Sequence, residues 1–177
     1  MNFSHRLATR GDLPSLSELM AAAISELQKG FLSQDQIAAS RVTMGLDTQL
    51  IDDGTYFIIE ADGVLAGSGG WSRRYTLYGG DHTPGRNAAL LDPTTDAARV
   101  RAMYTSPVFA RRGVGRLLLS LCEAAAAAEG FQRVELAGSM SGEPLYRACG
   151  YQPIERFTDD RGGVAVPLVR MGKALRM

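Results

Sequence analysis

The fold of this chain is decided by the stretch Tyr104-Thr-Ser-Pro-Val-Phe-Ala-Arg-Arg-Gly-Val-Gly-Arg-Leu-Leu-Leu119. A predicted strand runs into a short loop that ends in two glycines, and an amphipathic helix follows. The first turn of a helix has backbone N–H groups without partners and a partial positive charge, so it stabilises a bound anion. Gly113 and Gly115 would let a phosphate approach the backbone without meeting a Cβ atom. The stretch therefore predicts an anion site at the start of this helix.

Three arginines support the anion site. The helix N-terminus prefers negative charge, yet three positive side chains lie at it: Arg111, Arg112 and Arg116. Without a bound ligand, each positive charge there destabilises the helix by roughly a few tenths of a kcal/mol. A bound pyrophosphate would reverse the sign of this effect. The alternative is a glycine-rich turn with solvated arginines, and the strand–loop–helix context favours the anion site. Two nucleotide-binding motifs are absent. The P-loop motif is excluded because no Gly-Lys-Ser/Thr follows the glycines, and the dinucleotide-binding fingerprint is excluded because Leu118 occupies the position of its third glycine.

Periodicity and turn signals outside this stretch predict an α/β domain on a mixed sheet, with elements in the order β-α-α-β-β-β-α-β-α-β-β. The predicted strands cover residues 1–8, 55–61, 64–71, 99–105, 133–137, 151–156 and 164–171, and the predicted helices cover residues 12–30, 33–44, 113–130 and 142–149. Asp12 is the expected N-cap of the first helix, and Ser33 with Gln36 forms a capping-box pattern for the second. Asp62-Gly63 predicts a hairpin turn.

Length and charge limit the class of protein. A chain of 177 residues with 45% hydrophobic and 21% charged residues fits one compact domain, which we expect to span residues 1–177. Basic and acidic residues cancel, 19 against 19, whereas a protein that coats nucleic acid or an anionic membrane normally has a basic excess. All but two of the basic residues are Arg, which genome composition explains best, although Arg also binds phosphate in a two-pronged way that Lys cannot. We therefore expect neither a nucleic-acid nor a membrane partner.

The two cysteines and the hydropathy pattern bear on the compartment. Cys122 and Cys149 have no metal-ligand spacing, and each is expected to be a small apolar residue of a helix. No apolar run is long enough to span a membrane, and no signal-peptide pattern is present at the start of the sequence. These features predict a cytoplasmic protein.

Two motifs together resemble a known family. The stretch Ala110-Arg-Arg-Gly-Val-Gly115 is similar to the acetyl-CoA-binding motif of the GNAT superfamily of N-acetyltransferases, Gln/Arg-x-x-Gly-x-Gly/Ala after a strand. Leu145-Tyr-Arg-Ala-Cys-Gly-Tyr151 resembles the short helix with a catalytic tyrosine that this family places next. The resemblance covers nearly the whole chain and implies the GNAT-like fold, a largely antiparallel central sheet flanked by helices.

The resemblance implies a transferase that moves an acetyl group from acetyl-CoA, its co-substrate, directly to an amine without an acyl-enzyme and without a metal. Met103 and Thr105 would bind pantetheine through their backbones, and a backbone N–H near Met103 would polarise the thioester carbonyl. Tyr146 would protonate the departing thiolate. The pyrophosphate would be held by the loop and first helical turn, namely Arg111, Arg112, Gly113, Val114, Gly115 and Arg116.

Two departures from the family pattern leave side-chain contacts open. Ala110 occupies the Gln/Arg position, so a phosphate contact from there must come from Arg111 or Arg112, and Ser139 stands where an Asn is often found. A general base is expected, but Glu60, Asp81 and His82 are each more simply interpreted as solvated, so none is assigned.

Residues 72–97 carry five Gly or Pro residues and form a loop of unusual length. With Trp71 before it, the segment up to His82 mixes aromatic and charged residues. A substrate-facing wall and a tethered surface loop or dimer contact are equally compatible with this composition.

Three classes of function remain for comparison. The leading one is an N-acetyltransferase acting on a small-molecule amine or a protein amino group, and the family resemblance allows a homodimer. A non-catalytic acyl-CoA-binding regulatory module is the alternative, against which the tyrosine at position 146 argues. A nucleic-acid-binding domain has only the Arg content in its favour, and the neutral net charge opposes it.

Overall fold

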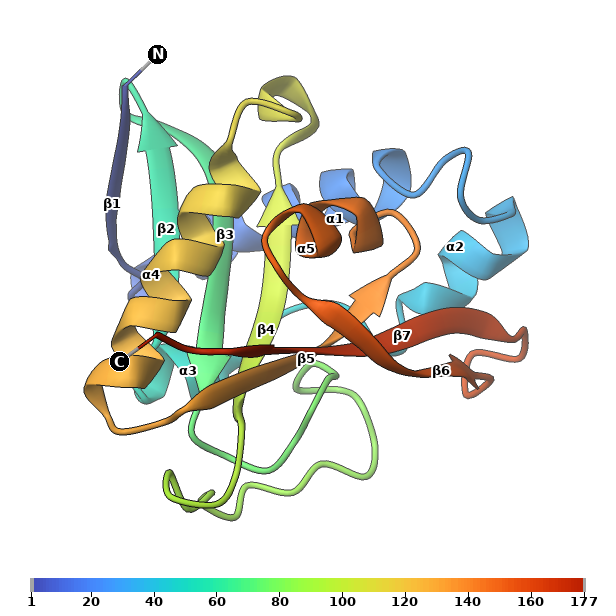
Figure 1. Cartoon of the computed structure of the whole chain (residues 1–177). Helices are drawn as coiled ribbons and strands as arrows, with labels where there is room; N and C mark the ends of the chain where they lie inside the picture. Colours follow the sequence, from blue (N-terminus) through green and yellow to red (C-terminus); the bar gives the residue numbers. More distant parts are fainter. Residues whose placement is uncertain (1, 177) are drawn as a thin grey trace.

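The computed structural model describes residues 2–176, so Met1 and Met177, the predicted domain limits, lie outside the described residues. The strands form one seven-stranded sheet with the order β1-β2-β3-β4-β5-β7-β6 (Figure 1). Only β4 and β5 pair in parallel, and every other neighbouring pair is antiparallel. The predicted mixed, largely antiparallel sheet flanked by helices is therefore confirmed.

The elements follow the predicted order with additions. The strands are β1 (Phe3–Leu7), β2 (Tyr56–Ala61), β3 (Val64–Ser72), β4 (Ala98–Thr105), β5 (Arg133–Ser139), β6 (Gln152–Asp159) and β7 (Val166–Ala174). The helices are α1 (Leu13–Glu26), α2 (Gln34–Ser40), α3 (Thr48–Asp52), α4 (Val114–Ala128) and α5 (Glu143–Ala148). The short helix α3 and two 3-10 turns, at Arg10–Asp12 and Pro107–Phe109, were not predicted.

Local signals explain where the first helices begin and end. The predicted capping box is present, since Gln36 N donates to Ser33 Oγ and Ser33 N donates to Gln36 Oε1. Asp12 does occupy the N-cap position of α1, but its carboxylate accepts from Thr9 N and from Arg6 instead of capping α1. The predicted extension of the second helix to Met44 is wrong, because the chain leaves α2 after Ser40 in a series of turns.

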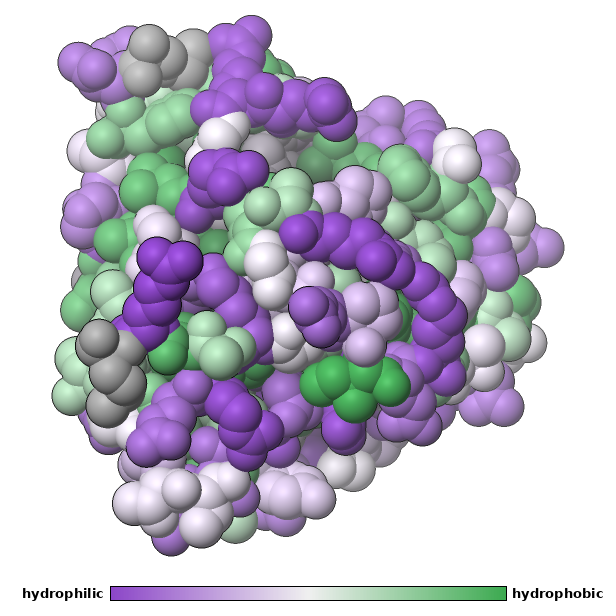
Figure 2. All heavy atoms as spheres, in the orientation of Figure 1, coloured by the Kyte–Doolittle hydropathy of each residue, from purple (hydrophilic) through white to green (hydrophobic). Residues whose placement is uncertain are grey.

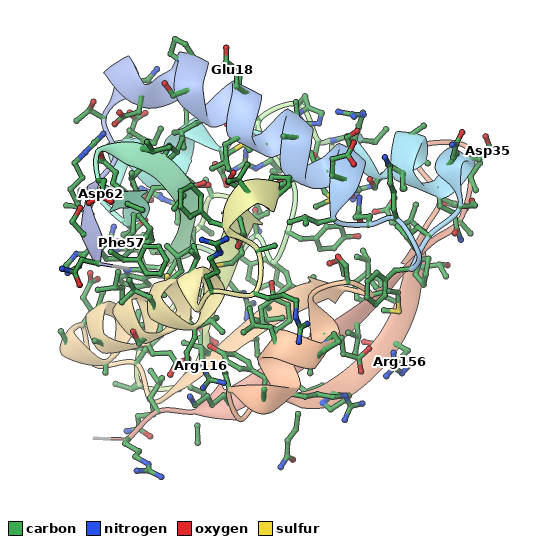
Figure 3. The ribbon with its side chains drawn as sticks, turned by 90° about the horizontal axis from the view of Figure 1, so that it is seen from above. Glu18, Asp35, Phe57, Asp62, Arg116 and Arg156 are labelled. Atoms are coloured by element: carbon green, nitrogen blue, oxygen red, sulfur yellow. The ribbon has the colours of Figure 1, made fainter. Side chains whose placement is uncertain are left out.

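The sheet is covered on both faces. Alternate residues of β2 point to opposite sides, so Tyr56 and Ile58 pack with α1, while Ile59 packs with Val114 and Leu118 of α4. Seen from above, α1 and α4 lie on opposite sides of the strands (Figure 3). On the face drawn in Figure 2, polar side chains cover much of the surface and apolar ones are interspersed among them. Among the described residues, no helix has the length and hydropathy required to cross a membrane.

The two halves of the sheet separate between β4 and β5. In the described chain these strands pair only at Ala98 with Val134 and at Arg99 with Glu135. Beyond this point β4 continues toward Thr105 and β5 toward Ser139 without pairing with each other. The backbone edges that these two strands turn toward one another therefore face an opening. This divergence produces the cleft in which the candidate site lies.

A bulge in β4 lies beside this cleft. Ala102 has a φ of +53°, and the register between β3 and β4 shifts between Ser68 and Gly70. The Tyr56 hydroxyl donates a hydrogen bond of 2.8 Å to the Ala102 carbonyl, which holds the bulge in place. The bulge changes the direction in which the backbone groups of the following residues point.

Candidate functional site

The loop between β4 and α4 has the geometry expected of an anion cradle. After the 3-10 turn at Pro107–Phe109, Arg111 adopts a φ of +61° and Gly113 a φ of +92°. Gly113 occupies the N-cap position, and α4 begins at Val114. The first N–H groups of α4 are thus presented at the end of a tight turn, where an anion is stabilised.

The two glycines of this loop are required for different reasons. A Cβ on Gly113 would have open space within 4 Å, so the positive φ of this residue is what favours glycine there. A Cβ on Gly115 would lie 2.5 Å from Leu145 Cδ2. Gly115 therefore allows α4 to contact α5 closely, which brings the first motif next to the second.

Among the described residues, the three arginines of the loop have no anionic partner. Of the seventeen arginines in the chain, twelve form ion pairs with Asp or Glu. Within residues 2–176, Arg111, Arg112 and Arg116 make none, and all three are exposed. An unneutralised cluster at a helix N-terminus is typical of a site for a phosphate group.

A cavity of about 90 Å³ occupies the cleft between β4 and β5. Its walls come from both strands, from α5, from β7, from the chain after α2 and from the long loop. The residues that line it are Thr43, Met44, Gly45, Leu77, Tyr78, Gly79, Val100, Arg101, Ala102, Met103, Tyr104, Leu136, Ala137, Ser139, Tyr146 and Leu168.

Tyr146 is fixed in the wall of this cavity. A Cβ on Gly142 would lie 2.8 Å from Tyr146 Cε2 and one on Gly138 would lie 3.2 Å from its ring, so both glycines make room for the ring. Tyr151 packs edge-on with a centroid distance of 6.0 Å. The side chain of Tyr146 is 8% exposed, and within the described chain its hydroxyl forms no hydrogen bond. Burial raises the pKa of Tyr146, so the phenol stays protonated and able to donate.

The remaining predicted site residues lie either on β4 or at the start of α4. Met103 lines the cavity beside Tyr146, directly after the bulge residue Ala102. Thr105 pairs with Gly67 at the end of β4 and is not part of the lining. The loop arginines, Gly113, Val114 and Gly115 lie at the start of α4 and are linked to the cavity through the contact between Gly115 and Leu145, the neighbour of Tyr146.

The three residues considered as general bases do not line the cavity. Glu60 accepts from Arg6 at 2.8 Å in the β1–β2 pair. Asp81 bonds to Thr48 N and Arg86 and lines a second, polar cavity of about 220 Å³ between α3 and the long loop. His82 Nε2 lies 2.7 Å from the Arg41 carbonyl oxygen.

The long loop contributes to the wall of the cleft through Leu77, Tyr78 and Gly79. It contains no helix or strand but is held by side chains: the Tyr78 hydroxyl donates to Asp159 at 2.7 Å, and Arg161 bonds both Asp159 and the Pro84 carbonyl. Trp71, in contrast, belongs to the core and packs edge-on against Phe131.

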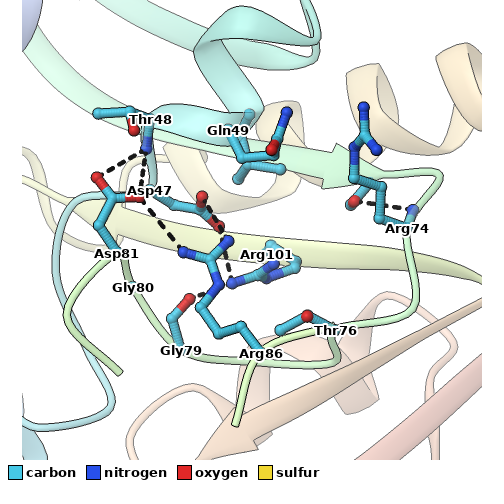
Figure 4. Close-up of polar contacts among 12 residues, drawn as sticks. Asp47, Thr48, Gln49, Arg74, Thr76, Gly79, Gly80, Asp81, Arg86 and Arg101 are labelled. Carbon is cyan, nitrogen blue, oxygen red and sulfur yellow. Dashed lines mark hydrogen bonds and ion pairs between the residues drawn. The ribbon is translucent and has the colours of Figure 1, made fainter. Parts of the chain in front are cut away.

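A buried ion pair beneath the cavity was not predicted from the sequence. Arg101 Nη2 lies 2.8 Å from Asp47 Oδ2, and these side chains are 3% and 1% exposed (Figure 4). Arg86 adds a hydrogen bond of 2.9 Å to Asp47 Oδ1, and Arg101 also bonds the Gly79 carbonyl. The pair therefore connects β4 to the segment before α3, and the contacts of Arg86 and Gly79 connect the long loop to this pair. Burial lowers the pKa of Arg101, and the Asp47 carboxylate opposes that shift.

The comparisons with known proteins agree with this geometry. Residues 19–151 match the family described as the Acetyltransferase (GNAT) family. The chain belongs to this family. A GNAT protein transfers an acetyl group from acetyl-CoA to an amine, so the predicted acetyl-CoA-dependent N-acetyltransferase is confirmed, and nothing supports the alternative of a non-catalytic module. A search of the curated proteins found no match.

Solved structures share the GNAT fold over the full length of this chain. A GCN5-related N-acetyltransferase from Rhodopseudomonas palustris has a TM-score of 0.73 at 20% identity, with 99% of this chain and 97% of that chain covered. PaiA N-acetyltransferase from Thermoplasma acidophilum, in complex with coenzyme A, has a TM-score of 0.65 at 15% identity, with 98% and 99% covered. YncA from Salmonella typhimurium, with its cofactor acetyl-CoA, has a TM-score of 0.65 at 17% identity, with 100% and 96% covered.

Between residues 2 and 176, no group of three or more His, Cys, Asp or Glu side chains is arranged so that it could hold a metal ion.

Proposed function

We propose that acetyl transfer takes place in the cleft between β4 and β5, with the thioester beside Met103 and the CoA sulfur beside Tyr146. The observation that carries this proposal is the buried Tyr146 side chain, whose hydroxyl lacks a hydrogen-bond partner within the described chain and which lines the same cavity as the divergent part of β4. Pantetheine would bond the free backbone edge of β4 from Met103 to Thr105. The pyrophosphate would bind at the start of α4, to the N–H groups of Gly113–Arg116 and the guanidinium groups of Arg111, Arg112 and Arg116.

The reaction is a direct displacement. The amine nitrogen attacks the thioester carbonyl carbon, and the developing oxyanion is stabilised by a backbone N–H near Met103. The carbon–sulfur bond then breaks, the thiolate takes the proton of the Tyr146 hydroxyl, and the phenolate regains a proton from water. The proton lost by the nitrogen passes to water, because the ionisable side chains that line the cavity are Tyr78, Arg101, Tyr104 and Tyr146 and none is a base at neutral pH.

Binding is tested first by thermal shift with acetyl-CoA, ATP and NAD, followed by an amine panel with thiol detection. We expect stabilisation by acetyl-CoA above that by ATP or NAD at equal concentrations. Absence of any stabilisation by acetyl-CoA would contradict the proposed site.

Replacing Arg111, Arg112 and Arg116 together with Gln should weaken acetyl-CoA binding by about 10- to 100-fold, because each arginine contributes a charge-assisted contact with the pyrophosphate. Isothermal titration measures the change in Kd. The matched control replaces three exposed arginines from surface ion pairs, Arg10, Arg133 and Arg156, with Gln and removes the same charge.

The assignment to pyrophosphate is tested with S-acetylpantetheine, which lacks that group. The triple variant should turn over this truncated donor at the rate of the original protein. An equal loss with both donors, or a loss in the control variant that matches the triple variant, would show that the loop arginines do not contact the pyrophosphate.

The pH dependence should follow the amine. With no carboxylate or imidazole in the lining, kcat/KM should rise about tenfold per pH unit up to the pKa of the acceptor, since only the neutral amine attacks. Burial raises the pKa of Tyr104 to about 12 and raises that of Tyr146, so both stay protonated over this range. Two acceptors of different pKa should therefore give two different midpoints. A shared midpoint would point to a base supplied by the protein.

The acceptor is an amine of a small molecule or of a protein, and we propose a cytoplasmic location, where acetyl-CoA is available. The free thiols of Cys122 and Cys149 agree with a reducing compartment. The expected lack of nucleic-acid and membrane partners, the possible homodimer and the single domain over residues 1–177 stay predictions.

A further inference from the structure

The chemistry of the cavity walls favours one class of acceptor. Apart from Arg101, backbone and small residues, the walls are aliphatic and aromatic. Leu77 and Tyr78 come from the long loop, Met44 from the chain after α2, and Leu168 from β7. Such walls gain free energy from apolar surface that they remove from water, about 25 cal/mol for each Å².

Among the described residues that line the cavity, none is an anion that could bind a second ammonium group. The one charged side chain of this lining is Arg101, which is itself a cation. The nearby carboxylates are already engaged by arginines: Asp47 by Arg101 and Arg86, and Asp159 by Arg161. An additional cation inside the cavity would lose its hydration without gaining a counterion, and that penalty is several kcal/mol per ion.

The tyrosine that the long loop contributes to the wall does not replace the missing anion. A cation can be attracted to the face of a tyrosine. The Tyr78 ring, however, already has the Arg161 guanidinium carbon 5.6 Å from its centroid. The Tyr78 hydroxyl is used as well, because it donates to Asp159. A cationic group placed on this wall would therefore meet a positive charge instead of a free electron-rich face.

From these observations we propose that the acceptor is a monoamine on an apolar or aromatic group, bound as the free base, and that Leu77 and Tyr78 select it against diamines and polyamines. This proposal rests on the proposed function, because it concerns the amine that enters the same cleft. It adds which amines react and which part of the chain selects them.

The test compares acceptors that differ by one charge. Initial rates of CoA thiol release are measured with the full-length protein for butylamine, 1,4-diaminobutane and 2-phenylethylamine at one pH. We expect kcat/KM for butylamine to exceed that for the diamine by about tenfold or more, with 2-phenylethylamine the best of the three. An equal or higher value for the diamine would overturn the proposal. Turnover of none of the three would also overturn it.

The position of the selecting wall is tested by placing a carboxylate in it. Leu77→Glu should raise the diamine-to-butylamine ratio of kcat/KM about tenfold or more, because the new anion pairs with the second ammonium group. Leu90→Glu is the matched control, since Leu90 belongs to the same loop, is 67% exposed and does not line the cavity. An unchanged ratio in the Leu77 variant, or the same change in the control, would overturn the assignment. If Leu77→Glu does not fold, the ratio in the unaltered protein still decides the question of acceptor class.

These rate measurements distinguish a failure of the proposed acceptor class from a failure of acetyl transfer itself. Preference for the diamine defeats the proposed acceptor class and leaves acetyl transfer in place. If peptide α-amines also give no acetyl-CoA-dependent product in the same assay, the proposed function fails as well.

Discussion

Tyr146→Phe is expected to lower kcat by about 10²- to 10⁴-fold, the usual contribution of a positioned acid, while the Kd for acetyl-CoA changes by less than about twofold. The physical reason is that the phenylalanine ring fills the same space between Gly138 and Gly142 but offers no proton to the departing sulfur. Steady-state kinetics and titration of acetyl-CoA measure the two quantities separately.

A control and a second donor distinguish proton donation from a structural effect. Tyr75→Phe, at a tyrosine that is 57% exposed, should leave kcat unchanged. With an acetyl thioester of a more acidic thiol, the loss caused by Tyr146→Phe should shrink, since that sulfur leaves without a proton. Unchanged turnover in Tyr146→Phe, or an equal loss with both donors, would remove Tyr146 from its proposed role.

Asp47→Ala is expected to cost about 3–5 kcal/mol in the free energy of unfolding, because it leaves the Arg101 guanidinium buried without its carboxylate. Urea denaturation measures this loss. Asp52→Ala is the control: its partner Arg10 is 61% exposed and Asp52 is 46% exposed, so the free energy of unfolding should change far less than in Asp47→Ala.

Removing both charges should recover part of the stability. In Asp47→Ala combined with Arg101→Met, no uncompensated charge remains beneath the cavity, so the double variant should be more stable than Asp47→Ala alone. A loss below about 1 kcal/mol in the single variant would mean that the pair behaves as an exposed one and does not stabilise the contact between β4 and the segment before α3.

Features that depend on nearby residues could be predicted from the sequence. The capping box of Ser33 and Gln36 is local, and so is the hairpin turn, where Asp62 and Gly63 have φ values of 50° and 79°. The start of α4 after Gly113 follows from the same kind of signal. Each depends on a few neighbouring residues, so the sequence carries the information directly.

Features that depend on distant residues could not be predicted. Tyr78 and Asp159 are 81 positions apart, and Asp47, which directly precedes α3, meets Arg101 of β4 only in the folded chain. The bulge at Ala102 has no glycine or proline to indicate it, although its φ is positive. The role of Gly115 in the contact with Leu145 likewise requires α5 to be placed first.

The central claim is tested most directly by counting both products of one reaction. The protein is mixed with acetyl-CoA and an amine, either 2-phenylethylamine or a short peptide with a free α-amine, and mass spectrometry quantifies free CoA and the N-acetylated amine. We expect both to form in equal amounts and only when an amine is present. Release of CoA without acetylated amine, or no amine-dependent release with either acceptor, would contradict it.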